Sequence, residues 1–197
     1  QQKGYQQAYR SMEAAAKDTE GEMLFYQSKV CEGVFHRISS GTTRDGLEVF
    51  GKMEKGYLLS VDSNWDMYGD GYLSGHYFSE GALREQLEKA YPGLVFTEEP
   101  VENQINMYKR DKVGHILSLT VGNKTISGEE FRQLLELPSS NFTMQAADGK
   151  IRFLCKGQGH GLGLSQYGGN VLAKEGKSYK EILRYYFPEC GVQKKDS

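Results

Sequence analysis

A glycine-rich stretch, GQGHGLGLSQYGG, constrains the fold of this chain more than any other part of the sequence. It begins at Gly157, and its first four glycines alternate with larger residues. If the stretch were extended, one face would be bare and the other would carry side chains such as Gln158 and His160. Such spacing indicates close backbone approach or unusual φ values. The pattern becomes helical after Ser165, so we expect polar residues where a bare strand meets a helix N-terminus.

Length and composition indicate a globular protein. The chain has 197 residues, enough for a substantial core, and its hydrophobic content of 38% and charged content of 25% are ordinary for soluble domains. The net charge of −2 provides no basic field, so we expect no nucleic-acid partner. We predict an α+β fold with mixed or antiparallel sheets and several short helices, in which residues 1–197 form one compact domain.

Helix signals are strongest at two capping boxes. Ser127 with Glu130 and Ser178 with Glu181 have the spacing in which each side chain caps the other residue's backbone. Further helices are expected over residues 6–17, 79–90 and 165–175, the last ending at a C-terminal glycine, Gly176.

Short apolar runs predict the strands. They lie at residues 24–26, 34–38, 57–61, 107–110, 115–121, 142–145 and 151–155. We expect the first two to flank a turn at residues 28–29, and 107–110 to form a hairpin with 115–121. The last strand leads directly into the glycine-rich stretch.

Acidic residues show no informative pairing. Asp62 and Asp66 begin a run like a calcium loop, but Met67 and Leu73 stand where that loop needs glycine and glutamate. We therefore expect a turn stabilised by Asx hydrogen bonds. Asp62, Asp66 and Glu48 are candidate general acids by their loop positions, although a solvated surface acid is the more common identity.

The histidines do not share the spacing of a metal site, and we predict none. His115 alternates with strand residues, which favours a structural role, and His76 is expected in an exposed loop. His36 and His160 each adjoin a hydroxyl-rich or glycine-rich segment. These two are the histidines most suited to function, although a hydrogen-bonded structural role is the alternative for each.

Cysteine usage leaves the compartment open. Cys31, Cys155 and Cys190 lack CxxC spacing and are odd in number, which leaves room for one bridge but not for a disulfide framework. No apolar run reaches 18 residues, so we expect no transmembrane helix. The sequence starts at Gln1 without a signal peptide, and we expect it to be part of a longer protein.

The segment GHGLGLSQYGG, followed by AKEG and YKEILRYYF, resembles the closing motif of the stage II sporulation protein D family. Gly169 stands where that motif usually has alanine. Three further segments resemble family motifs in the same order: FHRISSG at 35–41, YLLSVDSNWD at 57–66 and ISGEEFRQLLELPSSNFTM at 126–144. The resemblance covers nearly the whole chain.

This resemblance implies work on peptidoglycan. Family members are similar to lytic transglycosylases that cleave glycan strands between N-acetylmuramic acid and N-acetylglucosamine, leaving a 1,6-anhydro product. They prefer strands that an amidase partner has stripped of stem peptides, and they act in engulfment during sporulation. It further implies an extracytoplasmic protein of a Gram-positive-type bacterium, secreted or held by an N-terminal membrane anchor outside this sequence. No cofactor is implied.

The family's general acid/base is a glutamate in an EMP-type segment ahead of an AxAARTY helix, and this sequence contains neither segment. We therefore expect an N-terminally truncated domain whose catalytic residue is unknown. The candidate substrate-binding residues on the family motifs are His36, Ser39, Ser40, His160, Ser165, Gln166 and Tyr167.

Two functional classes stay open: a glycan-cleaving enzyme, and a non-catalytic wall-binding module that enhances an N-acetylmuramoyl-L-alanine amidase. In either class, a binding role for His160 predicts that His160→Ala weakens glycan cleavage or binding at least about tenfold with a nearly unchanged melting temperature. A purely structural role predicts unfolding instead.

Overall fold

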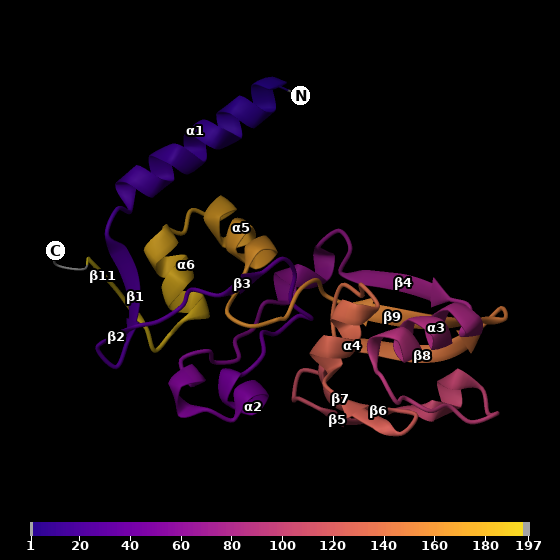
Figure 1. Ribbon diagram of the computed structural model, residues 1–197. Coiled ribbons are helices and arrows are strands. Elements are labelled where there is room, and N and C mark those ends of the chain that lie inside the picture. Colours follow the sequence, from indigo (N-terminus) through magenta and orange to yellow (C-terminus); the bar gives the residue numbers. More distant parts are fainter. Residues whose placement is uncertain (1, 195–197) are drawn as a thin grey trace. The chain divides into compact units, whose positions relative to one another are not determined.

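The computed structural model describes residues 2–194, and their side chains from Gly4 onward (Figure 1). Within that range it has six α-helices, and its strands form small, mostly antiparallel sheets, so the predicted α+β class is confirmed. Contacts divide the chain into two compact units. One combines the residues up to Gly33 with those from Glu189 onward, and the other runs from Val34 to Pro188.

The first unit consists of one helix and one sheet. Its elements are α1 (Gln2–Asp18), β1 (Glu22–Tyr26), β2 (Lys29–Val30) and β11 (Gly191–Lys194), with the strand order β11-β1-β2. The predicted N-terminal helix is confirmed. β1 does not pair with residues 34–38 as expected, because Gln27 and Ser28 both adopt positive φ (49° and 63°). This conformation closes a tight hairpin in which Tyr26 faces Lys29.

The core of the second unit is built from two helices and two three-stranded sheets. The helices are α3 (Glu80–Ala90) and α4 (Gly128–Leu134). The first sheet has the strand order β4 (Leu73–Phe78), β9 (Lys150–Lys156), β8 (Phe142–Ala147). The second sheet has the strand order β5 (Ile105–Arg110), β6 (Ile116–Val121), β7 (Lys124–Ile126). Phe131, Phe142 and Phe153 are fully buried, with ring centroids 5.4–5.8 Å apart. Leu83 and Leu87 of α3 complete this packing.

Most local predictions in this core are confirmed, including the β5–β6 hairpin, the strands β8 and β9, and the capping box of α4. The second predicted capping box forms at α6. Two strands of this core were missed, β4 and the three-residue β7. β4 pairs along its whole length with β9, so His76 lies in a strand opposite Phe153 and not in an exposed loop. β4 was not predicted because the serine, glycine and histidine at its centre are not among the residues enriched in strands, and its strand conformation depends on packing against β9.

The remaining elements of the second unit position the candidate site. They are β3 (Phe35–His36), α2 (Gly46–Phe50), the 3-10 helices Met53–Lys55, Asn64–Tyr68 and Val101–Gln104, β10 (Leu164–Ser165), α5 (Gln166–Lys174) and α6 (Tyr179–Tyr186). β3 and β10 pair in parallel. The strand expected at 57–61 does not form. Tyr57 and Leu58 are buried, and the Leu58 and Val61 carbonyls accept hydrogen bonds from the N–H groups of Gly46 and Thr43.

None of the helices in residues 2–194 has the length and apolar character needed to cross a bilayer.

Candidate functional site

The glycine segment, defined as residues 157–163, is not a strand. Gly157, Gly159, Gly161 and Gly163 all have left-handed φ angles, between 68° and 105°. A left-handed residue at every second position turns the chain out of the pleat, so the expected bare strand face is wrong. The unusual φ values expected as one reason for the glycines are confirmed.

Close approach is the second reason for these glycines. A Cβ atom built on Gly159 would lie 2.8 Å from the Cβ of His36, and one on Gly161 would lie 3.0 Å from the His115 ring. A Cβ on Gly163 would collide with the carbonyl oxygen of Val34. The segment therefore lets neighbouring side chains and backbone pack directly against its own backbone.

His36 is buried against this segment, with only 4% of its surface exposed. Its Nδ1–H donates to the Leu162 carbonyl (3.0 Å), which fixes the neutral ring with its lone pair on Nε2. Burial lowers the pKa of His36 to about 4, outweighing the hydrogen bond that favours the charged form. The ring is therefore neutral at neutral pH. Its Nε2 is buried and has no hydrogen-bond partner in the described part of the chain.

His160 lies beside His36, half-buried, with ring centroids 5.9 Å apart. Its Nδ1 accepts a hydrogen bond from the backbone N–H of Leu162 (3.1 Å). Burial also lowers the pKa of His160, although the nearby Glu129 carboxylate and a hydrogen bond with Phe35 act in the opposite direction. Leu162 thus accepts from one histidine through its carbonyl and donates to the other through its N–H.

A buried ion pair holds the other side of the glycine segment. Arg44 Nε lies 2.6 Å from Asp111 Oδ2, and both side chains are almost fully buried. Arg44 also donates from Nη1 to the His160 carbonyl (3.1 Å) and from its backbone N–H to the Gly161 carbonyl (2.8 Å). Because a buried charge without its partner is costly, this pair fixes the segment at two consecutive carbonyls.

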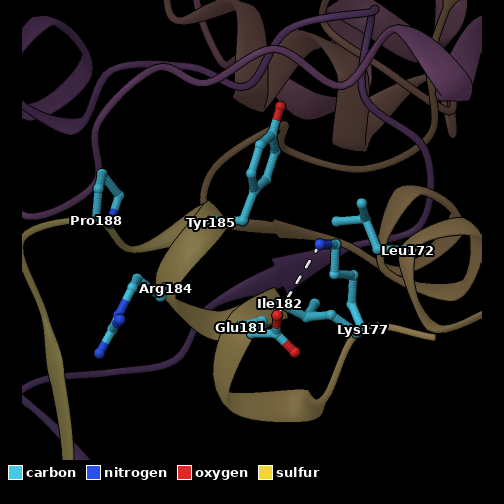
Figure 2. A pocket seen from close by; sticks show the side chains of 7 residues that line it. All are labelled: Leu172, Lys177, Glu181, Ile182, Arg184, Tyr185 and Pro188. Atoms are coloured by element: carbon cyan, nitrogen blue, oxygen red, sulfur yellow. Dashed lines mark ion pairs between the residues drawn. The ribbon is translucent and has the colours of Figure 1, made fainter. Parts of the chain in front are cut away.

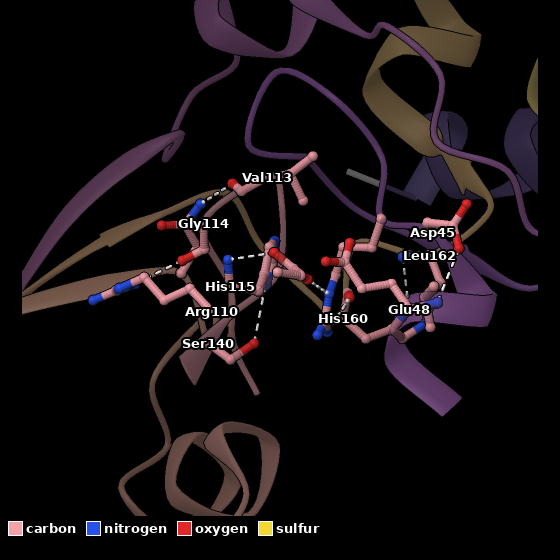
Figure 3. Close-up of polar contacts among 12 residues, drawn as sticks. Asp45, Glu48, Arg110, Val113, Gly114, His115, Ser140, His160 and Leu162 are labelled. Carbon is pink, nitrogen blue, oxygen red and sulfur yellow. Dashed lines mark hydrogen bonds and ion pairs between the residues drawn. The ribbon is translucent and has the colours of Figure 1, made fainter. Parts of the chain in front are cut away.

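The third histidine, His115, completes a histidine cluster with His36 and His160. Figure 3 shows the His115 ring beside Ser140, whose Oγ lies 3.0 Å from His115 Nδ1. The backbone N–H of His115 donates to Asp111 Oδ1 (2.8 Å). Burial lowers the pKa of His115 well below its usual value, and the Arg44 charge adds to this effect. The structural role predicted for His115 agrees with these contacts.

Asp66 connects two of the family motifs from inside the protein. Its Oδ2 accepts from the Ser39 backbone N–H (2.7 Å), and its Oδ1 accepts from the Ser165 hydroxyl (2.8 Å). The Ser165 Oγ in turn accepts from the Gly168 N–H, which caps α5 as predicted. Asp66 is fully buried in a 3-10 helix, so its expected identity as a solvated acid in an Asx turn is wrong.

The structure brings the predicted site residues together but gives them different exposures. His36, Ser39 and Ser165 are buried, whereas Ser40, His160 and Tyr167 are half-buried and Gln166 is exposed. His36 faces Ser165 in the β3–β10 register, and the Tyr167 N–H donates to the Arg37 carbonyl (3.1 Å). The polar groups that can face a ligand therefore belong to His160, Gln166 and Tyr167, because the Ser40 hydroxyl oxygen is itself buried.

Sequence reasoning missed Arg44 and Asp111 as parts of this site. Neither residue belongs to a quoted motif, and their side chains meet across 67 positions of the chain. The one signal in the sequence was that both residues are charged and lie next to segments that become buried. Among the described residues, no group of three or more histidine, cysteine, aspartate or glutamate side chains has the geometry to hold a metal ion.

A hollow of about 410 Å³ lies on α5 and α6 (Figure 2). It is lined by Leu172, Lys177, Glu181, Ile182, Arg184, Tyr185 and Pro188. None of the seven predicted site residues contributes to its wall, and its one ion pair, between Lys177 and Glu181, is long at 3.9 Å and exposed. We therefore keep the candidate site at the glycine segment.

Comparison with known proteins agrees with the motif resemblance. No protein-family model matches the sequence. The chain is 29% identical to stage II sporulation protein D of Bacillus amyloliquefaciens and 27% identical to that of Bacillus subtilis, over 98% of the chain in both cases. It is also 42% identical to a Bacillus subtilis amidase enhancer over 50 residues, which is 25% of the chain and 7% of that protein.

The chain spans about half the length of the two sporulation proteins, matching 54% of each. The alignment nevertheless covers 98% of this chain, which contains the segments around His36 and His160. The chain is a homologue of stage II sporulation protein D.

Proposed function

We propose that this chain is the glycan-binding portion of a lytic transglycosylase-like protein that acts on peptidoglycan strands stripped of stem peptides. The observation that carries the proposal is the Asp66 network. It joins the serine-rich loop after β3 to the N-terminus of α5, so that residues from two separate motifs present polar groups beside each other. The homology to stage II sporulation protein D supports a role in cell-wall remodelling during sporulation.

The half-buried and exposed site residues have the chemistry that a glycan requires. The Gln166 amide is exposed and can both donate and accept hydrogen bonds, as sugar hydroxyls and N-acetyl groups do. Tyr167 adds an aromatic ring and a phenolic hydroxyl at the same helix terminus. The buried residues His36, Ser39 and Ser165 hold these groups in place, which lowers the entropy lost on binding.

Cleavage by the whole protein would need a general acid beside the glycosidic oxygen. The resemblance places that glutamate in a segment this sequence does not contain, so we assign it to no residue here. We further propose an extracytoplasmic location, membrane attachment through an N-terminal anchor or secretion, and an amidase that prepares the substrate.

A second function has its own supporting observation, the 50-residue match to an amidase enhancer. A module of that class would bind the wall without cutting it. Two assays on the full-length protein separate the two functions: release of 1,6-anhydro-muropeptides, and stimulation of a purified amidase. Product release without amidase stimulation favours the enzyme, and the reverse result favours the enhancer.

Binding by this chain is tested by co-sedimentation with sacculi. We expect stronger binding to amidase-treated sacculi than to untreated sacculi, because stem peptides block access along the strand. Gln166→Ala should weaken that binding about three- to tenfold, the value of one hydrogen bond, with an unchanged melting temperature. Gln145→Ala, an exposed glutamine on β8, is the matched control. Equal binding to both kinds of sacculi would contradict the proposal.

The structure changes what we expect of His160→Ala. Removing the ring leaves the Leu162 N–H without its acceptor, which costs about 1–3 kcal/mol when the group is buried. A nearly unchanged melting temperature is therefore no longer expected for this variant. Gln166→Ala separates binding from stability more cleanly.

A further inference from the structure

Two cysteines lie next to each other in the smaller unit, which combines the N-terminal residues up to Gly33 with the residues from Glu189 onward. The Sγ atoms of Cys31 and Cys190 are 3.6 Å apart, although the residues are separated by 159 positions. Cys31 follows β2, and its backbone N–H donates to the Leu24 carbonyl on β1 (2.9 Å). Cys190 directly precedes β11, which pairs with the other edge of β1. The sheet itself therefore brings the two side chains together.

We propose that Cys31 and Cys190 form a disulfide bond that closes this sheet. The S–S bond is about 2.05 Å long, so the two sulfurs need to approach by only about 1.5 Å, within reach of small side-chain rotations. The inference rests on this placement and is independent of the proposed glycan function.

The chemistry is thiol–disulfide exchange with an oxidised partner thiol pair, such as a disulfide oxidoreductase or oxidised glutathione. One protein thiolate attacks the partner disulfide to form a mixed disulfide, and the second protein thiolate then displaces the partner's remaining sulfur. Two protein thiols lose two protons and two electrons, and the partner disulfide is reduced to two thiols. The new Sγ–Sγ bond is the only bond gained by this chain.

The environment of the pair favours a structural bond over a reactive thiol. Burial and the adjacent Cys31 together raise the pKa of Cys190 to about 12, so little thiolate exists at neutral pH. Reactive cysteines instead have lowered pKa values in electropositive surroundings. Cys155 is the third cysteine, buried in β9 of the larger unit, and provides an internal comparison.

The position of the bond gives it a clear consequence. Cys31 lies three residues before Val34, where the larger unit begins, and Cys190 lies two residues after Pro188, where it ends. The bond would join the two connections between the units and close a very long loop of chain. Long loops give the largest entropic stabilisation, and we expect the oxidised protein to melt roughly 5–15 °C above the reduced protein.

Peptide mapping tests the bond directly. The protein is incubated with oxidised glutathione, alkylated under denaturing conditions and digested with trypsin without reductant. We expect one linked species joining residues 30–37 (VCEGVFHR) to residues 185–194 (YYFPECGVQK), lighter than their sum by two hydrogens. Residues 153–156 (FLCK) should be recovered alkylated. Separate, alkylated forms of the first two peptides, or a link to the third, would overturn the proposal.

Matched variants complete the test. Cys155→Ser should leave the linked species intact, and Cys31→Ser or Cys190→Ser should abolish it. The double variant Cys31→Ser/Cys190→Ser should melt at the same temperature with and without dithiothreitol, whereas the wild type should lose several degrees on reduction. A linked wild-type protein that melts like its reduced form would refute the stabilising role.

Discussion

Replacing Gly163 by alanine should destabilise the protein much more than the same change at Gly149, although the two φ angles, 68° and 70°, are nearly equal. An L-residue in the left-handed region costs about 1–2 kcal/mol. At Gly149 that is the whole cost, because a Cβ there would have no heavy atom within 4 Å. At Gly163 the Cβ would collide with the Val34 carbonyl and lie 3.1 Å from the Phe187 ring.

Forcing an extra methyl group into packed surroundings adds about 1–3 kcal/mol, so the total for Gly163→Ala is about 2–5 kcal/mol. Urea unfolding measures both variants, with Trp65 as the probe. It is the only tryptophan of the chain, lies in the same unit and contacts Tyr185 (5.8 Å between ring centroids). The slopes against urea must be equal for the comparison to hold. Equal free energies of unfolding for the two variants would refute the close approach of the Val34 backbone.

Two further predictions concern buried charge. Asp66→Asn should lower the free energy of unfolding by about 2–4 kcal/mol and weaken glycan binding, because the asparagine side chain has one acceptor oxygen for the two donors, the Ser39 N–H and the Ser165 hydroxyl. The control is Asp62→Asn at an exposed position, and equal losses of stability in the two variants would contradict the network. Because the pKa of His36 falls from about 6.5 unfolded to about 4 folded, the unfolded state binds the extra proton as pH falls through that window. His36 alone should therefore lower stability by about 2 kcal/mol between pH 7 and pH 5. His115 and His160 act in the same direction, so His36→Asn should remove the His36 part of the dependence and leave the remainder, as measured by urea unfolding at the two pH values.

Local signals predicted the elements that local physics decides. The capping boxes at Ser127 and Ser178 formed as expected, since each is completed within four residues of chain. The β5–β6 hairpin and the neighbouring strands β8 and β9 were also predictable, because short connections place the paired strands next to each other in the sequence. These elements make up most of the core of the larger unit.

Elements that depend on distant partners were missed or misplaced. β11 pairs with β1 across most of the chain, and β10 pairs with β3 although only two residues of each take part. A two-residue strand has no pattern of its own to detect. The run at 57–61 shows the opposite failure, because its apolar residues are buried without forming a ladder.

Asp66 shows why the candidate site could be located from the sequence but not constructed from it. An acid in a polar loop is usually solvated, and burial of its charge is favourable only when donors converge on it. Here those donors come from the loop after β3 and from the start of α5, at 27 and 99 positions from Asp66. Motif matching gave the segments that carry the donors, but not their meeting at one carboxylate. The same carboxylate explains why buried Ser39 and Ser165 belong to the site. Through Asp66, Ser39 fixes the backbone of half-buried Ser40, and Ser165 fixes the backbone that presents exposed Gln166.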